Sequence, residues 1–421
     1  MIDFLNTARV RILSGRVLVG RALVLTAGRA LASVLSAAWV IIIARGLTVS
    51  EFGEVSVALA LVIVLGSLSD FGLQFILARD VVDTGVIRRP VLDAVVLRRV
   101  VLAFVAAAIM VVLYVIGTRD YNLAVPAVFS LSIVGAGLYN PTVSAYRATG
   151  KIAMEVISEI GSRAVVLVGG GLWVLAAGGG IMAVAVAYSG VGVAMGVIDY
   201  LFVRTRSVAS DPAHRPLPSL SPRASAPFAL ATTVGAVYTR IDNYLVSLLR
   251  GAASAGIYGA SYRFQDINML LPAALGQLAL SEAAGKDPRT RLSTGKRVAA
   301  QSVLLALVPA VVLSLFAQPL LTFLFGDKYA SAAPIVVVLL LSTIPGAAAV
   351  AIQALTGVTD PRRFAVATGG ALACNVVANL VLIPPFAGLG AAWANVISQA
   401  FLAIAYYWVL WRKTEELVEV H

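Results

Sequence analysis

The residues of this chain that could carry chemistry are a few charged side chains set inside long apolar segments. Arg29, Arg240 and Arg263 each lie in such a segment. A guanidinium stays protonated even when water is removed, and its planar fork of N–H donors matches the oxygens of a phosphate. The three arginines therefore predict contacts to an anionic ligand that contains phosphate.

Acidic residues stand in the same apolar segments. Asp70, Asp242 and Asp266 are candidates for ion coupling, because a carboxylate that is shielded from water binds a proton readily. An alternative is equally open, in which Asp70 or Asp242 only locks an arginine of a neighbouring helix. Asp266 lies three residues after Arg263, so these two can also pair within one helix.

Polar residues recur at helical spacing around these charges and form stripes. Steps of three or four residues put Ser33 and Ser36 on the face of Arg29. The same spacing connects Asp70 with Gln74. If these stripes meet between two halves of the chain, they line a polar cavity. The residues expected to line it are Ser33, Ser36, Gln74, Tyr244, Tyr258, Tyr262 and Gln265.

Two further spacings predict helix packing rather than ligand contact. Glu159 and Arg163 are four residues apart, so we expect them to pair within one helix. Side-chain amides four residues apart are expected to form hydrogen bonds between helices, and they occur at Asn375 and Asn379 and at Asn395 and Gln399.

The elements that position these residues must be membrane-spanning helices. The chain has 421 residues, of which 60% are hydrophobic and 13% charged, with a mean hydropathy of +0.92. Soluble domains are about 45–50% apolar and about 25% charged. A soluble protein of this length cannot bury so much apolar surface, so the bilayer must be part of the solvent.

Apolar runs separated by Gly, Pro or charged residues predict twelve spanning helices. Each run is close to the roughly 20 residues that cross a bilayer. The expected spans are about 22–45, 54–78, 96–117, 122–146, 156–178, 180–203, 226–249, 256–281, 298–325, 330–357, 363–384 and 388–411.

The distribution of basic residues predicts the orientation. With these twelve spans, 24 of the 32 Lys and Arg fall on the side that holds both termini. Positive residues concentrate in cytoplasmic loops, so both termini are expected in the cytoplasm. The five Trp fall near the ends of the expected spans, where an aromatic belt is usual.

A proline-rich segment divides the chain into two parts of six spans each. We expect an N-lobe at 1–205, with a short amphipathic segment at its start, then a cytoplasmic linker at 206–225 and a C-lobe at 226–421. Arg45-Gly46 and Phe52-Gly53 in the first part are echoed by Arg250-Gly251 and Tyr258-Gly259 in the second. A parallel repeat of this kind is typical of alternating-access transporters.

Residues needed for several other kinds of chemistry are missing from the sequence. The single Cys374 allows no internal disulfide and no cysteine metal cluster, and only His214 and His421 could provide imidazole ligands. Neither a GxxxxGK[ST] phosphate loop nor an HExxH motif occurs. We therefore expect no cofactor and no bound metal. The membrane topology accounts for the net charge of +11 without a nucleic-acid partner.

Several short motifs, taken together, are similar to those of one transporter family. The first part carries Ala44-Arg45-Gly46-Leu47, Glu51-Phe52-Gly53 and Asp70-Phe71-Gly72-Leu73. The second part carries Arg240-Ile241-Asp242, Gly256-Ile257-Tyr258 and Gly388-Leu389-Gly390-Ala391-Ala392. In this combination the chain resembles the Wzx-type polysaccharide-biosynthesis flippases of the multidrug/oligosaccharidyl-lipid/polysaccharide exporter superfamily.

This resemblance implies both a fold and a function. The fold would be a V-shaped bundle of two six-helix lobes, like that of multidrug exporters of the same superfamily. The function would be to flip an isoprenoid-pyrophosphate-linked oligosaccharide from the inner to the outer leaflet of the bacterial cytoplasmic membrane by alternating access. Arg29, Arg240 and Arg263 would engage the pyrophosphate.

The resemblance also implies partners, and it leaves alternatives open. The partners would be the lipid-linked glycan, membrane lipids, a coupling ion (H+ or Na+), and a glycan polymerase or glycosyltransferases. One alternative is an ion-coupled drug or cation antiporter of the same superfamily, which would need a cavity dominated by carboxylates. The other is a non-transporting membrane enzyme or scaffold of glycan assembly, which would have no continuous cavity.

Overall fold

The computed structural model describes residues 27–171, 173–174, 178, 180–209, 218, 222–283 and 287–419. Within these ranges the chain forms helices and short connections, apart from one isolated β-bridge between Arg88 and Val208. The expected amphipathic segment at the start and much of the expected linker lie outside the described residues.

We refer to the helices before residue 210 as the first half of the chain and to those from Pro222 on as the second half. In chain order, the first half consists of helix Ala27–Gly46, α2 (Val49–Asp70), α3 (Leu73–Thr84), α4 (Arg89–Thr118), α5 (Ala124–Ala148), α6 (Ile152–Val165), the π-helix η1 (Val166–Gly170) and α8 (Gly180–Thr205). The second half consists of α9 (Pro222–Arg250), α10 (Ala252–Asn268), α11 (Leu270–Ala283), α12 (Pro288–Leu315), α13 (Ala317–Phe325), the 3-10 helix η2 (Asp327–Ala332), α14 (Ala333–Thr359) and α15 (Pro361–Glu419).

Local sequence explains where several helices begin and bend. Thr48 and Glu51 form a capping box that starts α2. Asp287 accepts a hydrogen bond from the backbone N–H of Thr290 at 3.0 Å and so starts α12. Hydrogen bonding at Thr290 holds the pKa of the Asp287 carboxyl below its usual range. At Ala387, φ is 50°, and this break divides α15 into two arms that coincide with the last two expected spans.

Eight of the described helices are long and apolar enough to cross a membrane. They include helix Ala27–Gly46, α2, α4, α5, α8 and α12, and the chain is a multi-pass membrane protein. The expected spans at 226–249 and 256–281 coincide with α9 and with α10 and α11, which carry more charged and polar residues. The total of twelve spans and the cytoplasmic position of both termini remain predictions.

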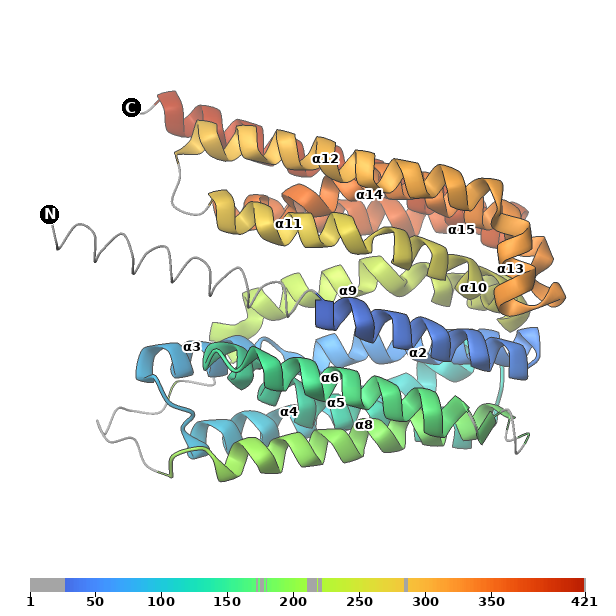
Figure 1. Ribbon diagram of the computed structural model, residues 1–421, viewed down its shortest axis with the longest axis horizontal. Coiled ribbons are helices and arrows are strands. Elements are labelled where there is room, and N and C mark those ends of the chain that lie inside the picture. Colours follow the sequence, from blue (N-terminus) through green and yellow to red (C-terminus); the bar gives the residue numbers. More distant parts are fainter. Residues whose placement is uncertain are drawn as a thin grey trace, which may run out of the picture.

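The helices form a layered bundle (Figure 1). Helices α4, α5, α6 and α8 lie together at the bottom of the view, whereas α11, α12, α14 and α15 lie at the top. Between them, α2 of the first half packs against α9 and α10 of the second half. The largest hydrophobic cluster contains residues of both halves, including Phe52, Tyr114 and Tyr258.

The two halves are in close contact at the end of the bundle where α13 lies, on the right of Figure 1. A Cβ atom added at Gly53 on α2 would stand 1.8 Å from the carbonyl oxygen of Ala252. One added at Gly256 on α10 would stand 2.2 Å from the carbonyl oxygen of Val49. Only glycine permits this approach of two backbones, so these two positions fix the crossing of α2 and α10.

Polar contacts also join the halves at that end. The Arg45 Nε donates to the Leu324 carbonyl at 2.8 Å, and the Lys328 Nζ donates to the Arg45 carbonyl at 3.2 Å. Farther along, the Ser247 hydroxyl donates to the Gly117 carbonyl at 2.9 Å. The structure therefore represents a state in which the halves are joined at the α13 end.

Candidate functional site

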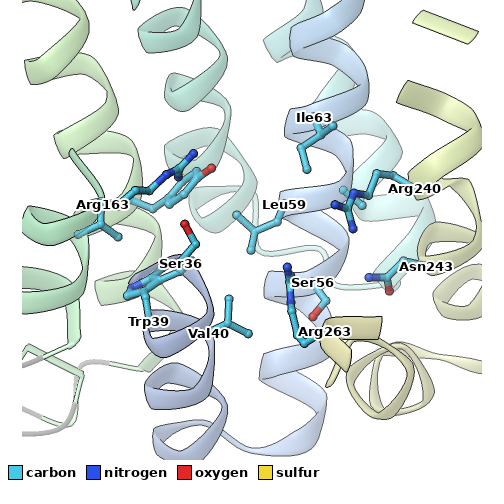
Figure 2. A pocket seen from close by; sticks show the side chains of 13 residues that line it. Ser36, Trp39, Val40, Ser56, Leu59, Ile63, Arg163, Arg240, Asn243 and Arg263 are labelled. Atoms are coloured by element: carbon cyan, nitrogen blue, oxygen red, sulfur yellow. The ribbon is translucent and has the colours of Figure 1, made fainter. Parts of the chain in front are cut away.

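Three arginines from different helices line one cavity between the halves. Arg163 stands on α6, Arg240 on α9 and Arg263 on α10. Figure 2 shows Arg163 on one side of the cavity and the other two on the opposite side. The volume of this central cavity is about 200 Å³. Its other lining residues include Ser36, Trp39, Ser56, Leu59, Tyr188 and Asn243.

A second, larger cavity adjoins the same three arginines. This side cavity has a volume of about 540 Å³. Helix Ala27–Gly46 and the α10–α11 junction provide a mainly apolar wall to it, which consists of Ala32, Val34, Ala37, Ile41, Ile267 and Leu270. Glu159 and Asp266 are the acidic residues that line it. A charged region and an apolar wall are thus next to each other.

A third cavity lies within the first half, among α2, α5, α6 and α8. This inner cavity has a volume of about 130 Å³, and its lining includes Ser132, Tyr139, Ser162 and Tyr188. Apart from Arg163, its lining residues are uncharged. Arg163 therefore borders all three cavities.

The charges around the cavities do not balance. Arg240 and Arg263 share one carboxylate, since Asp266 lies 3.6 Å from the first and 3.2 Å from the second. The second of these contacts confirms the expected pair within α10. The Arg240 guanidinium also lies over the Tyr262 ring, 5.2 Å from its centre. Among the residues that line the central and side cavities, three guanidinium groups thus face two carboxylates, an excess of one positive charge.

The expected pair of Glu159 and Arg163 is not found among the ion pairs of the described residues. Both side chains line the side cavity, yet their charged groups lie apart. A spacing of four residues permits a pair on a helix but does not require one. Arg163 therefore lines the cavities, although its spacing from Glu159 predicted a role in helix packing.

Arg29 lies away from the three cavities described above. Its Nη2 donates to Glu155 at 3.2 Å, and the same carboxylate binds Arg147 at 2.6 Å. The side chain of Glu155 is 1% exposed, so these contacts hold a carboxylate that is otherwise buried. Of the stripe predicted with Arg29, Ser33 lines the side cavity, and Ser36 lines both the central and the side cavity.

The tyrosines and glutamines expected in the cavity wall pack elsewhere in this state. Tyr258 donates to Asp242, and Gln265 donates to Asn395 at 3.2 Å. The hydroxyl of Tyr262 donates to the Thr239 carbonyl. These side chains are buried within the second half, because the stripe on α10 faces α9 and α15 as well as the opposite half.

Tyr244 and Gln74 also lie outside the three cavities. Tyr244 donates to the Leu113 carbonyl of the opposite half at 3.1 Å, so its polar group joins α9 to α4. Gln74 lies half-buried near the start of α3, beyond the bend that ends α2. Helical spacing alone did not reveal this bend.

The three candidate coupling acids have different surroundings. Asp70 forms an ion pair with Arg99 at 2.6 Å, and both side chains are at most 5% exposed. Asp242 is buried and accepts hydrogen bonds from Tyr258 and, at 3.4 Å, from Asn395. Asp266 faces the side cavity. Asp70 therefore matches the alternative in which the carboxylate forms an ion pair with an arginine of a neighbouring helix.

The side-chain amides of the second half form buried hydrogen bonds, of which the Asn375 contact joins the two arms of α15 and matches the expected bonding between helices, whereas the Asn379 contact lies within one arm. Asn375 donates to the Ser398 hydroxyl at 3.0 Å, and Asn379 donates to Asn375. Among the described residues, there is no group of three His, Cys, Asp or Glu side chains that could hold a metal ion.

Trp39 corrects one expectation. Its side chain is 4% exposed and stacks on Tyr188 with ring centres 5.3 Å apart, so it belongs to the central cavity rather than to an aromatic belt. Trp173, Trp393, Trp408 and Trp411 are between 37% and 48% exposed, as residues of a belt would be.

Comparison with known proteins gives a family and a fold. The family model described as "Polysaccharide biosynthesis protein" matches residues 18–280. No curated protein matches the chain significantly by sequence. An inward-facing multidrug resistance MATE family transporter of the MOP superfamily is similar in structure, with a TM-score of 0.70 and 14% identity over 92% of this chain and 96% of its own.

Two further structures show the same fold. The lipid II flippase MurJ in an inward closed conformation has a TM-score of 0.70 and 12% identity, over 94% of this chain and 91% of its own. A MOP superfamily transporter from Pyrococcus furiosus, reported with a reverse polarity of its binding pocket, has a TM-score of 0.65 and 14% identity, over 94% and 95%.

Proposed function

The chain belongs to the polysaccharide biosynthesis protein family and has the fold of the MOP superfamily transporters, and from this premise we propose its substrate. The substrate is an isoprenoid-pyrophosphate-linked oligosaccharide, which the protein flips from the inner to the outer leaflet of the bacterial cytoplasmic membrane. The oligosaccharide then serves the export of a surface polysaccharide.

The observation that carries this proposal is the charge of the cavities between the halves. Arg163, Arg240 and Arg263 face Glu159 and Asp266, and the excess of guanidinium groups favours an anionic ligand. Arginine binds phosphate oxygens through two parallel N–H donors, and a site shielded from bulk water strengthens that attraction. A diphosphate matches such a site.

The apolar wall of the side cavity supports an amphiphilic substrate. Val34, Ile41 and Leu270 line the same cavity as the arginines. An isoprenoid chain against this wall would stay in an apolar environment while its diphosphate reached the charged region. A water-soluble anion has no apolar part that would contact this wall.

The contacts at the α13 end support an alternating-access mechanism. Because the halves are joined there, a substrate would load from the opposite end of the bundle. In the predicted topology, that opposite end faces the cytoplasm. We propose that 1–205 and 226–421 rock as two lobes and open the α13 end after loading.

Asp242 is the strongest candidate for ion coupling. Its carboxylate is buried in the second half and is surrounded by the polar groups of Tyr258 and Asn395. Asp70 is a weaker candidate because it already has Arg99 as a partner. The coupling ion, H+ or Na+, would enter this polar cluster as the halves move.

A drug or cation antiporter is the second candidate function. It has support from the fold, since multidrug MATE transporters share it. The charge of the cavities does not favour an antiporter, because a cationic drug would lie beside more arginines than carboxylates. A membrane enzyme or scaffold of glycan assembly has no observation in its favour.

The proposal is tested by the double variant Arg240→Gln/Arg263→Gln in cells that export the polysaccharide. We expect surface polysaccharide to fall at least about tenfold, because two charge-assisted contacts to the diphosphate are lost. Arg204→Gln provides a control that removes an arginine outside the cavities, where Arg204 pairs with Asp93. Normal export by a double variant that inserts at the normal level would refute the proposal.

A further inference from the structure

We infer that Arg163 is the residue that lets this protein distinguish a lipid diphosphate from a lipid monophosphate. In this assignment, Arg240 and Arg263 hold one phosphate, and Arg163 holds the other from the opposite wall. The inference rests on the proposed function, and it names the part of the substrate that the first half recognises.

The first observation is the position of Arg163. It is provided by α6 of the first half, whereas Arg240 and Arg263 are provided by the second half. Figure 2 shows its side chain across the central cavity from the other two. Since all three arginines line both the central and the side cavity, an anion between them contacts both halves at once.

The second observation is the difference in charge compensation. Arg240 and Arg263 already share Asp266, so part of their positive charge is balanced in the empty cavity. Arg163 forms no ion pair with the described residues, although Glu159 lies one turn away on the same helix. Of the three arginines, Arg163 is thus the one whose positive charge is least balanced. A second negative group of the substrate would therefore bind there.

The third observation is the local structure of the helix that carries Arg163. Three residues after Arg163, the chain changes from the α-helix α6 to the π-helix Val166–Gly170, and Val166 lines the central cavity. Single-turn π-helices occur frequently at functional sites, because the wider turn changes where the neighbouring side chains point.

The inner cavity indicates which of the two phosphates of the substrate lies at Arg163. This otherwise uncharged space is lined by Arg163 and by residues such as Ser132, Tyr139 and Ser162. The side cavity with its apolar wall borders all three arginines, whereas the inner cavity borders Arg163 but neither Arg240 nor Arg263. The phosphate at Arg163 is therefore the one that bears the sugar, and the phosphate at Arg240 and Arg263 is the one that bears the lipid.

The inference predicts a selectivity that can be measured without knowing the glycan. Farnesyl diphosphate and farnesyl monophosphate differ by the one phosphate that Arg163 would hold. The dissociation constant of each is measured with purified full-length protein in detergent. We expect the wild type to bind the diphosphate about tenfold or more tightly than the monophosphate, since arginine provides a charge-assisted contact.

Arg163→Gln should reduce that ratio to about one, mainly through weaker diphosphate binding. Arg163→Lys keeps the charge but loses the planar fork, so an intermediate ratio is expected. Arg204→Gln is the matched control and should keep the wild-type ratio, because Arg204 lies on α8 outside the three cavities. Thermal unfolding checks that each variant folds, and the Lys variant provides the test if the Gln variant does not.

Two results overturn the inference alone, and a third overturns it together with the proposed function. A wild type without preference for the diphosphate, or an arginine variant that keeps the full preference, shows that Arg163 does not read the second phosphate. A wild type that binds neither farnesyl compound refutes the proposed function and the inference together. A double variant Arg240→Gln/Arg263→Gln that loses both ligands supports the function whatever Arg163 does.

Discussion

Arg45 and Lys328 each donate to backbone carbonyls of the segment that carries the other. Arg45 donates to Phe323 and Leu324 at the end of α13, and Lys328 donates to Arg45 and Leu47 at the end of helix Ala27–Gly46. Cations are favourable at helix C-termini because the last carbonyls lack partners within the helix. This reciprocal contact joins the two halves across the α13 end.

The first prediction concerns this contact. Replacing both residues in Arg45→Ala/Lys328→Ala should favour states that open at the α13 end, because four hydrogen bonds between the halves are lost. Accessibility is measured with an impermeant thiol reagent applied to intact cells, with Ser56→Cys introduced into a Cys374→Ser background. The labelling rate should rise severalfold.

Arg119→Ala is the control for that experiment. Arg119 is a basic residue at the same end of the bundle, and its side chain forms no hydrogen bond or ion pair with the described residues. Its loss should leave the labelling rate unchanged. Equal labelling of the double variant and the control would show that the Arg45 and Lys328 contacts do not hold this end closed.

The second prediction compares two glycines of one helix. Gly53→Ala should impair export strongly, because its Cβ would lie 1.8 Å from the Ala252 carbonyl oxygen and would push α10 away. Gly66→Ala on the same helix should be tolerated, since nothing lies within 4 Å of its Cβ position. Export and membrane level are measured together. If both variants export alike, closure of α2 on α10 is not part of the transport cycle.

The third prediction separates a structural role of Asp70 from a coupling role. Asp70→Ala leaves Arg99 buried without its partner, which costs about 3–5 kcal/mol in comparable pairs. The unfolding temperature in detergent should drop clearly. The double variant Asp70→Leu/Arg99→Met should recover it, because the buried charge is then gone. A stable Asp70→Ala variant that fails only in transport would instead indicate coupling.

The fourth prediction concerns Arg29. The single variant Arg29→Gln should reduce export less than Arg240→Gln does. Arg29 is held by Glu155 outside the described cavities, and its side chain is 42% exposed, so its ion pair contributes about 1 kcal/mol or less. Export by the two single variants at matched membrane levels decides this. A larger loss for Arg29→Gln would mean that its pair breaks and that it reaches the substrate.

The helices could be predicted from the sequence because the bilayer imposes length and apolarity on each span. Gly, Pro and charged residues marked most of the boundaries. The echo of Phe52-Gly53 by Tyr258-Gly259 predicts a repeat, whereas the close crossing of α2 and α10 depends on Gly53 and Gly256. The break at Ala387 lies between the last two expected spans. The bend at Phe71-Gly72, where both residues have positive φ, was not visible as a boundary.

The cavity residues were harder to predict. Helical spacing shows which side chains share one face of a helix, but it does not show which helix or cavity that face contacts. Arg240 and Arg263 line the cavities as expected, whereas Tyr258, which was expected in the same cavity wall, is buried against Asp242. Arg163 was assigned to a pair with Glu159 by spacing alone. Only the packing of α6 across from α9 and α10 reveals that it faces the same cavity.

The central claim is that this cationic cavity carries a diphosphate-linked lipid across the membrane. The most direct test reconstitutes the protein in liposomes that contain a fluorescent isoprenoid-diphosphate-linked sugar and follows its transfer between leaflets with an impermeant quencher. We expect transfer that depends on the protein, that stops in Arg240→Gln/Arg263→Gln and that a cationic dye does not inhibit. Transport of the cationic dye without movement of the anionic lipid would contradict the claim.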